Sequence, residues 1–75
     1  MTSPVSRVVH GFITVTYDPR LPFLQRFTIR ERGGRIVRLR APRGEAHRAL
    51  VRECGLSRSA AARILNRLDG GQVHW

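Results

Sequence analysis

The sequence predicts an α+β protein in which a three-stranded antiparallel β-meander is followed by a hairpin of two helices. Apolar and polar residues alternate with a period of two before Pro42, which is the pattern of half-buried strands. After Pro42, apolar residues recur at spacings of three and four, the pattern of helices packed on a core. Gly33-Gly34 separates two alternating runs and predicts a two-residue hairpin turn, because glycine accepts the positive φ angles of such turns.

The length of 75 residues predicts one domain. Within 1–75, we expect the sheet over 8–41, a helical unit over 44–69 and a tail over 70–75. A domain this short buries a modest fraction of its surface and is marginal alone. A homodimer is therefore an open alternative to a monomer.

Three strands are predicted, over 8–17, 23–32 and 35–41. They are rich in β-branched or aromatic residues, and turn-forming residues over 18–22 separate the first two. Residues 1–6 are expected to fray. Gly11, inside the first predicted strand, marks a bulge or a close approach of two backbones. The predicted core consists of Ile13, Val15, Phe23, Phe27, Ile29, Val37, Leu39, Leu50, Val51, Leu56, Ile64, Leu65 and Leu68.

Arginines gather on one side of the predicted hairpin between the second and third strands. Alternation places them opposite the apolar residues, and they are Arg26, Arg30, Arg32, Arg38 and Arg40. Like charges this close repel unless an anion lies among them. Two interpretations stay open: a solvated sheet face, or a face that binds phosphates or lies in a groove of nucleic acid.

Two helices are predicted, over 44–54 and 58–69. Gly55 can take the left-handed conformation that ends the first helix. Ser57 can cap the second helix by accepting a backbone N–H. At about 100° per residue, the second helix has one apolar side and an opposite side that is small, polar and basic. The latter side carries Ser59, Ala62, Arg63 and Asn66.

The run Gly-Leu-Ser-Arg-Ser-Ala-Ala-Ala-Arg-Ile-Leu, which begins at Gly55, resembles the turn and recognition helix of bacterial helix-turn-helix DNA-binding proteins. Aligned on this glycine, the buried positions of that family fall on Leu50, Cys54, Leu56, Ala61 and Ile64, all apolar here. Val51 departs from the family, which has a small residue there, and would hold the helices slightly apart. The resemblance covers about 47–68. The other interpretation is a plain pair of helices over a small core.

The resemblance implies that the second helix enters the major groove. Residues that would approach base edges, where Arg suits guanine and Asn suits adenine, are Arg58, Ser59, Arg63 and Asn66. Arg52, Arg67 and backbone amides over 57–59 would hold phosphates. The segment from 35 to 42 with the following helix also resembles, more weakly, ribbon-helix-helix repressors. In that case a strand reads the groove, and Arg38 and Arg40 would be the readers.

The chain has a net charge of +9 from fourteen basic and five acidic residues, and every basic residue is arginine. A domain with an isoelectric point near 11.9 is drawn to polyanions, so double-stranded DNA is the expected partner and an acidic protein surface the next. Three functions stay open. They are a transcriptional regulator of phage or plasmid type using the helix-turn-helix, a sheet-type DNA reader, and a small protein that inhibits a nucleic-acid-handling complex, similar to anti-CRISPR proteins.

No catalytic or metal-binding pattern stands out. The histidines and Cys54 lack short-range ligand spacing, and no glycine-rich phosphate loop is present, so we expect no enzyme activity, cofactor or metal. The sequence has no apolar run near eighteen residues and no signal-peptide pattern. A single, buried, reduced cysteine fits the cytoplasm. Trp75 is expected to pack on the core, to pair as an extra strand or to dock on a partner.

Overall fold

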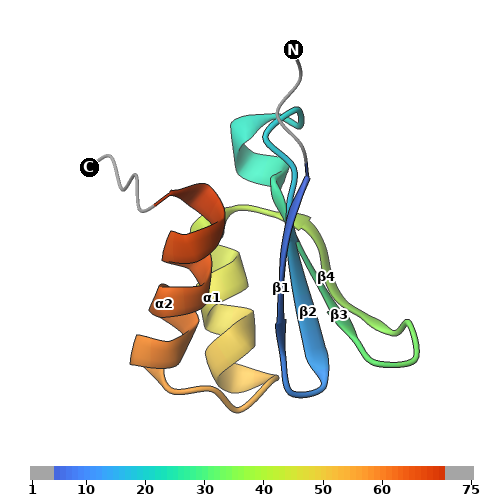
Figure 1. The fold of residues 1–75 in the computed structure, drawn as a ribbon, viewed down its shortest axis with the longest axis vertical. Helices are drawn as coiled ribbons and strands as arrows, with labels where there is room; N and C mark the ends of the chain where they lie inside the picture. The colour runs from blue at the N-terminus through green and yellow to red at the C-terminus, as the bar shows by residue number, and fades with distance from the viewer. Residues whose placement is uncertain (1–4, 71–75) are drawn as a thin grey trace.

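The computed structural model describes residues 5–70 of the chain. Its elements, in order, are β1 (Ser6–His10), β2 (Ile13–Tyr17), the 3₁₀ helix η1 (Phe23–Gln25), β3 (Phe27–Glu31), β4 (Ile36–Ala41), α1 (Arg43–Arg52) and α2 (Arg58–Asp69). The strands form one antiparallel sheet in the order β1-β2-β3-β4, and both helices cover the same face of it (Figure 1). The expectation for Trp75 lies outside the described residues.

The prediction of a three-stranded meander is wrong, because the segment predicted as one strand over 8–17 folds into two. β1 and β2 pair from Ser6 opposite Tyr17 to His10 opposite Ile13. Gly11, with φ at 61°, reverses the chain between them. The alternation of side chains continues through such a tight turn, which is why the sequence pattern resembles that of one long strand. The sheet therefore has four strands, and Ser6, predicted to fray, already belongs to it.

The start of the predicted strand over 23–32 is also wrong. Phe23–Gln25 forms a 3₁₀ turn in which the Gln25 N–H donates to the Pro22 carbonyl at 2.8 Å. The 3₁₀ turn keeps these residues out of the sheet, and the ladder with β2 begins at Phe27, which lies opposite Tyr17. Phe23 was predicted to lie in the core, but it is 75% exposed.

β4 leaves the regular ladder at two places. Its pairs with β3 are Phe27–Ala41, Ile29–Arg38 and Arg30–Ile36, so that each interval contains one extra residue on β4. An extra residue changes the side of the sheet that the following side chains face. Val37 is buried as predicted, whereas Leu39 is 58% exposed and its assignment to the core is wrong. Arg40 has a φ of 51°, the only positive φ of a non-glycine residue within 5–70.

The two helices follow directly from local signals. Pro42 precedes α1 in an extended conformation, and Glu45 lies in its first turn, where a negative charge is favourable. Ser57 caps α2, as predicted, and Gly70 ends it in the left-handed conformation. α1 lies against β3 and β4, and α2 lies against β1 and β2.

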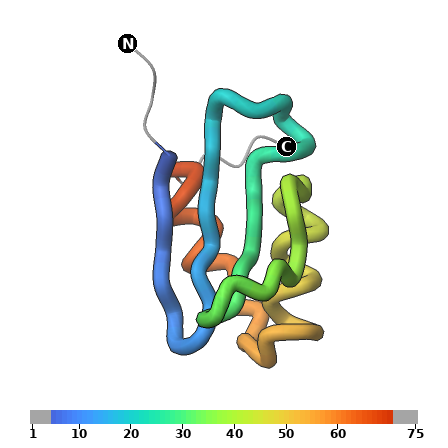
Figure 2. Tube along the Cα trace, turned by 90° about the vertical axis from the view of Figure 1, so that its right-hand side faces the viewer, coloured from blue at the N-terminus to red at the C-terminus, as the bar shows by residue number. Residues whose placement is uncertain are grey.

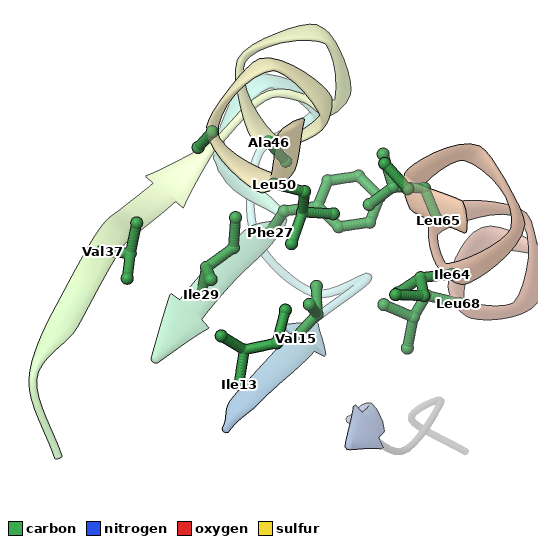
Figure 3. Close-up of a cluster of buried hydrophobic side chains, with 12 residues drawn as sticks. Ile13, Val15, Phe27, Ile29, Val37, Ala46, Leu50, Ile64, Leu65 and Leu68 are labelled. Carbon is green, nitrogen blue, oxygen red and sulfur yellow. The ribbon is translucent and has the colours of Figure 1, made fainter. Parts of the chain in front are cut away.

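A single core fills the space between the sheet and the helices (Figure 3). The predicted core residues that are buried are Ile13, Val15, Phe27, Ile29, Val37, Leu50, Ile64, Leu65 and Leu68. Val51 and Leu56 are half-buried and pack against this cluster. Ala46, Ala49 and Ala61 are also buried. Small side chains at these buried positions permit close packing of both helices on the sheet.

Candidate nucleic-acid interface

The five carboxylates of the chain are all bound by arginine side chains. The pairs are Asp18–Arg20, Glu31–Arg35, Glu45–Arg38, Glu53–Arg38 and Asp69–Arg43. Four of the fourteen arginines thus hold the acidic residues, and the other ten make no ion pair within residues 5–70. Those ten are Arg7, Arg26, Arg30, Arg32, Arg40, Arg48, Arg52, Arg58, Arg63 and Arg67. The excess positive charge is therefore spread over the helix layer and the sheet.

Helix α2 turns its apolar side to the core and leaves its polar side to solvent. The residues on this helix that the sequence predicted for DNA contact are Arg58, Ser59, Arg63, Asn66 and Arg67, and all five are exposed. Ala62 lies half-buried among them. The fold thus brings the predicted helix residues together on one solvent-facing surface, which we call the α2 face.

The first turn of α2 directs backbone amides at solvent. Ser57 accepts two hydrogen bonds, one from the Ala60 N–H to Oγ at 3.1 Å and one from the Ala61 N–H to its carbonyl at 3.0 Å. The N–H groups of Arg58 and Ser59 precede these bonds and have no carbonyl partner within the helix. No acidic residue lies in this turn. The helix start is therefore open to an anion such as a phosphate.

Asn66 is held by a residue of the other helix. Arg43, the first residue of α1, donates from Nη2 to Asn66 Oδ1 at 2.6 Å and from Nη1 to Asp69. The amide oxygen that Asn66 would use to accept from adenine is thus already engaged, and its NH₂ group remains a donor. The predicted adenine contact would require Asn66 to exchange Arg43 for a base.

The turn between the helices has the local geometry that the sequence predicted. Gly55 has a φ of 74°, and the Leu56 N–H donates to the Leu50 carbonyl at 3.0 Å. His47 Nε2 lies 3.3 Å from the carbonyl oxygen of Arg58, which adds a contact between α1 and the start of α2. Val51 is half-buried between the core and solvent. Both helices lie flat on the sheet, side by side (Figure 1).

Arg38 does not lie where the sequence predicted. The bulge in β4 places it opposite Ile29, on the helix side of the sheet, where its Nη2 is 2.5 Å from Glu53 and its Nε is 3.7 Å from Glu45. An open groove of about 270 Å³ lies beside this cluster, lined also by Arg48, Ala49 and Arg52. Arg38 thus forms ion pairs with two carboxylates, whereas Arg52, the last residue of α1, is exposed.

The predicted arginine face of the β3–β4 hairpin is therefore only partly present. Arg38 has moved to the helix side, and Arg26 donates from Nε to the Leu21 carbonyl at 3.0 Å while lying over the Phe23 ring. Arg30 and Arg40 are exposed, as predicted. The sequence analysis missed Arg7. This residue lies opposite Thr16, so both side chains are on the side of the sheet away from the helices. The signal would have been the alternation in β1, had it been recognised as a strand.

Three titratable groups outside these surfaces, Asp18, its partner Arg20 and Cys54, have altered pKa values. The hydrogen bonds that Arg20 donates to Asp18 lower the pKa of this carboxyl group. Burial raises the pKa of the Cys54 thiol, and the nearby charges of Glu31 and Glu53 raise it further. A thiol with a raised pKa is a poor nucleophile at neutral pH, which fits a packing role for Cys54.

No protein-family model, curated protein or solved structure matches the chain at a significant level. Within residues 5–70, no group of histidine, cysteine and carboxylate side chains is arranged to hold a metal ion. Neither of the described helices has the length and apolar composition needed to cross a membrane.

Proposed function

We propose that the protein binds double-stranded DNA with α2 in the major groove, as a small transcriptional regulator would. The observation that carries this proposal is the composition of the α2 face, where arginines without carboxylate partners adjoin small side chains. Ser59 and Ala62 let the helix backbone come close, and Arg63 lies beside Ser59, one turn further along the helix. The major groove, about 12 Å wide, accepts a helix of this kind.

Four exposed residues of α2, together with Arg52 of α1, have distinct roles in this proposal. Arg63 reads guanine through a bidentate contact to O6 and N7, and Arg58 reaches a second base. Arg67 and Arg52 hold phosphates on the two sides of the groove, together with the open amides at the helix start. Asn66 contributes less than the sequence alone suggests, because Arg43 holds its amide oxygen.

The test begins with selection of preferred duplexes from a random pool, followed by affinity measurements on alanine variants. Arg63→Ala should weaken binding to the selected site by about 1–3 kcal/mol and relax the preference at one position. Arg35→Ala is the matched control, since it removes the same charge from the hairpin tip, where Arg35 is paired with Glu31 at 3.1 Å. It should weaken all duplexes slightly and equally.

The salt dependence of DNA binding distinguishes recognition of a base sequence from attraction between opposite charges. A selected complex that survives at salt concentrations where random duplexes are released supports the proposal, because non-specific binding is the more salt-sensitive. Equal and sequence-independent losses in Arg63→Ala and Arg35→Ala would contradict it. The same conclusion would follow if selection returned no preferred duplex.

A further inference from the structure

No helix lies on the side of the sheet opposite α1 and α2, and the turn of the β3–β4 hairpin bends over the end of β2 on that side (Figure 2). Two rows of side chains cross it. One runs from Arg7 through Thr16 to Thr28, and the other from Val9 through Thr14 and Arg30 to Ile36. We call these seven residues the open sheet face. Its centre is made of threonines, and its two arginines lie in different rows.

The open sheet face is positively charged and contains no acidic residue. Arg7 and Arg30 make no ion pair or hydrogen bond through their side chains within residues 5–70. Arg40 is exposed close by, and its backbone N–H donates to Thr28 Oγ1 at 3.2 Å. A second copy of the same face would bring like charges together, which is unfavourable. The complementary partner is a polyanion.

The side chains of this face favour a duplex over a single strand. Proteins that bind single-stranded nucleic acids stack successive bases on several aromatic side chains, whereas none of the seven residues of the open sheet face is aromatic and the exposed Phe12 lies in the adjoining β1–β2 turn. Tyr17 and Phe27 pack against each other on the core side, with their ring centres 5.0 Å apart. Threonine hydroxyls and guanidinium groups instead suit phosphates.

We infer that the open sheet face binds a second segment of double-stranded DNA, so that one protein molecule joins two duplexes on its opposite sides. This inference rests on the proposed function, in which the α2 face holds the first duplex. A helix layer on a sheet is roughly 20 Å thick, whereas the Debye length at physiological salt is about 8 Å. The two duplexes therefore repel each other only weakly while each is held by its own arginines.

The experiment measures capture of one duplex by another. A biotinylated duplex on beads is saturated with the full-length protein, unbound protein is washed away, and a fluorescent duplex is added. The unaltered protein should retain the fluorescent duplex. The double variant Arg7→Ala with Arg30→Ala should retain at least about tenfold less, because two phosphate contacts are lost. Its binding to the first duplex, measured by gel shift, should remain within about threefold.

The matched control is Arg20→Ala with Arg35→Ala. It removes the same charge, so both double variants carry +7 instead of +9, but the side chains of Arg20 and Arg35 are paired with Asp18 and Glu31 and are not among the seven residues of the open sheet face. This control should still join two duplexes. Circular dichroism melts establish that both variants fold. Equal losses of capture in the two variants would overturn the inference, since capture would then depend on net charge alone.

The remaining outcomes separate this inference from the proposed function. Normal gel shifts without any capture by the unaltered protein would overturn the inference alone. Absence of any gel shift would overturn the proposed function. Sedimentation gives the mass of the free protein. If the protein is a dimer and the Arg7→Ala, Arg30→Ala variant becomes a monomer, the face is a subunit interface and the inference is wrong.

Discussion

The α2 face and the open sheet face both present arginines without carboxylates, but they differ in how firmly their side chains are held. On the helix layer, Arg43 ties Asn66 to α1, and His47 contacts the start of α2. On the sheet, the side chains of Arg7 and Arg30 have no such partners within residues 5–70. Side chains that are already fixed by hydrogen bonds lose less conformational entropy when they bind in one position. Side chains without partners can adjust to the repeating phosphates of a DNA backbone. The contacts fix the position of α2 itself, while the side chains of Arg58 and Arg63, like those of Arg7 and Arg30, make no ion pair within residues 5–70. The fixed helix suits base reading, and the sheet suits phosphate binding.

The comparison also shows that one residue type serves two purposes in this chain. Two of the paired arginines connect different elements, Arg38 joining β4 to α1 and the residue after it, and Arg43 joining α1 to the last turn of α2. Arginines without a carboxylate partner remain available to a polyanion. Because five carboxylates are distributed among four arginines, the division between paired and free arginines depends on the positions of few acidic residues.

The largest expected effect is on stability, and it tests whether α2 packs on the sheet through the buried core described above. Ile64→Ala should lower the free energy of unfolding by about 2–5 kcal/mol, because Ile64 is buried between α2 and the sheet. Ile36→Ala is the matched control on the open sheet face, where Ile36 is 42% exposed, and it should cost less than about 1 kcal/mol. Urea denaturation measures both. Similar costs for the two would mean that the register of α2 on the sheet is wrong.

A smaller effect tests whether the α2 face is held in place as described. Arg43→Ala should lower stability by about 1–2 kcal/mol, because it removes charged hydrogen bonds to Asn66 and Asp69. Arg35→Ala breaks an exposed pair at the hairpin tip and should cost less than about 0.5 kcal/mol.

A double-mutant cycle of Arg43→Ala and Asn66→Ala should show a coupling energy of about 0.5 kcal/mol or more. Thermal unfolding monitored by circular dichroism provides the four stabilities. Strict additivity of the two substitutions would mean that Asn66 is as free as Arg7, and the contrast between the two faces would disappear.

The smallest effect concerns the turn that sets the two helices side by side. Gly55→Ala should cost about 1 kcal/mol, because a side chain is strained at a φ of 74° even though nothing lies within 4 Å of the added Cβ. Gly44→Ala, inside α1 and equally unobstructed, should instead stabilise by about 0.5 kcal/mol. The midpoints of denaturant unfolding show whether each substitution lowers or raises stability. A Gly55→Ala variant as stable as the unaltered protein would contradict the positive φ at this turn.

The helices could be predicted from the sequence because their determinants are local. α2 begins and ends where its cap at Ser57 and its periodicity placed it, and α1 differs from its prediction by one residue at the start and two at the end. The residues of the α2 face followed from the same periodicity. What could not be foreseen there was Arg43, since a contact between residues 23 apart in sequence depends on how the helices pack.

The sheet was harder to predict because its errors arise at single residues with non-local consequences. A left-handed glycine at Gly11 divides one predicted strand into two without breaking the alternation. The bulges in β4 reverse the sides expected for Arg38 and Leu39, and nothing in the alternation of Val37, Arg38 and Leu39 signals them. Burial of Val37 against the helices and attraction of Arg38 by Glu45 and Glu53 favour the bulged register only once α1 is in place.

The same bulges affect how copies of the protein can associate through their strands. β4 is an outermost strand, and its two irregularities prevent a neighbouring chain from forming an unbroken ladder with it. β1, the other outermost strand, pairs with β2 without a register shift, and within residues 5–70 no strand pairs with its other side. Strand addition between copies is thus restricted to β1 against β1. Such a pairing closes on itself by two-fold symmetry, so self-association along the strands ends at two molecules and does not continue into a fibre.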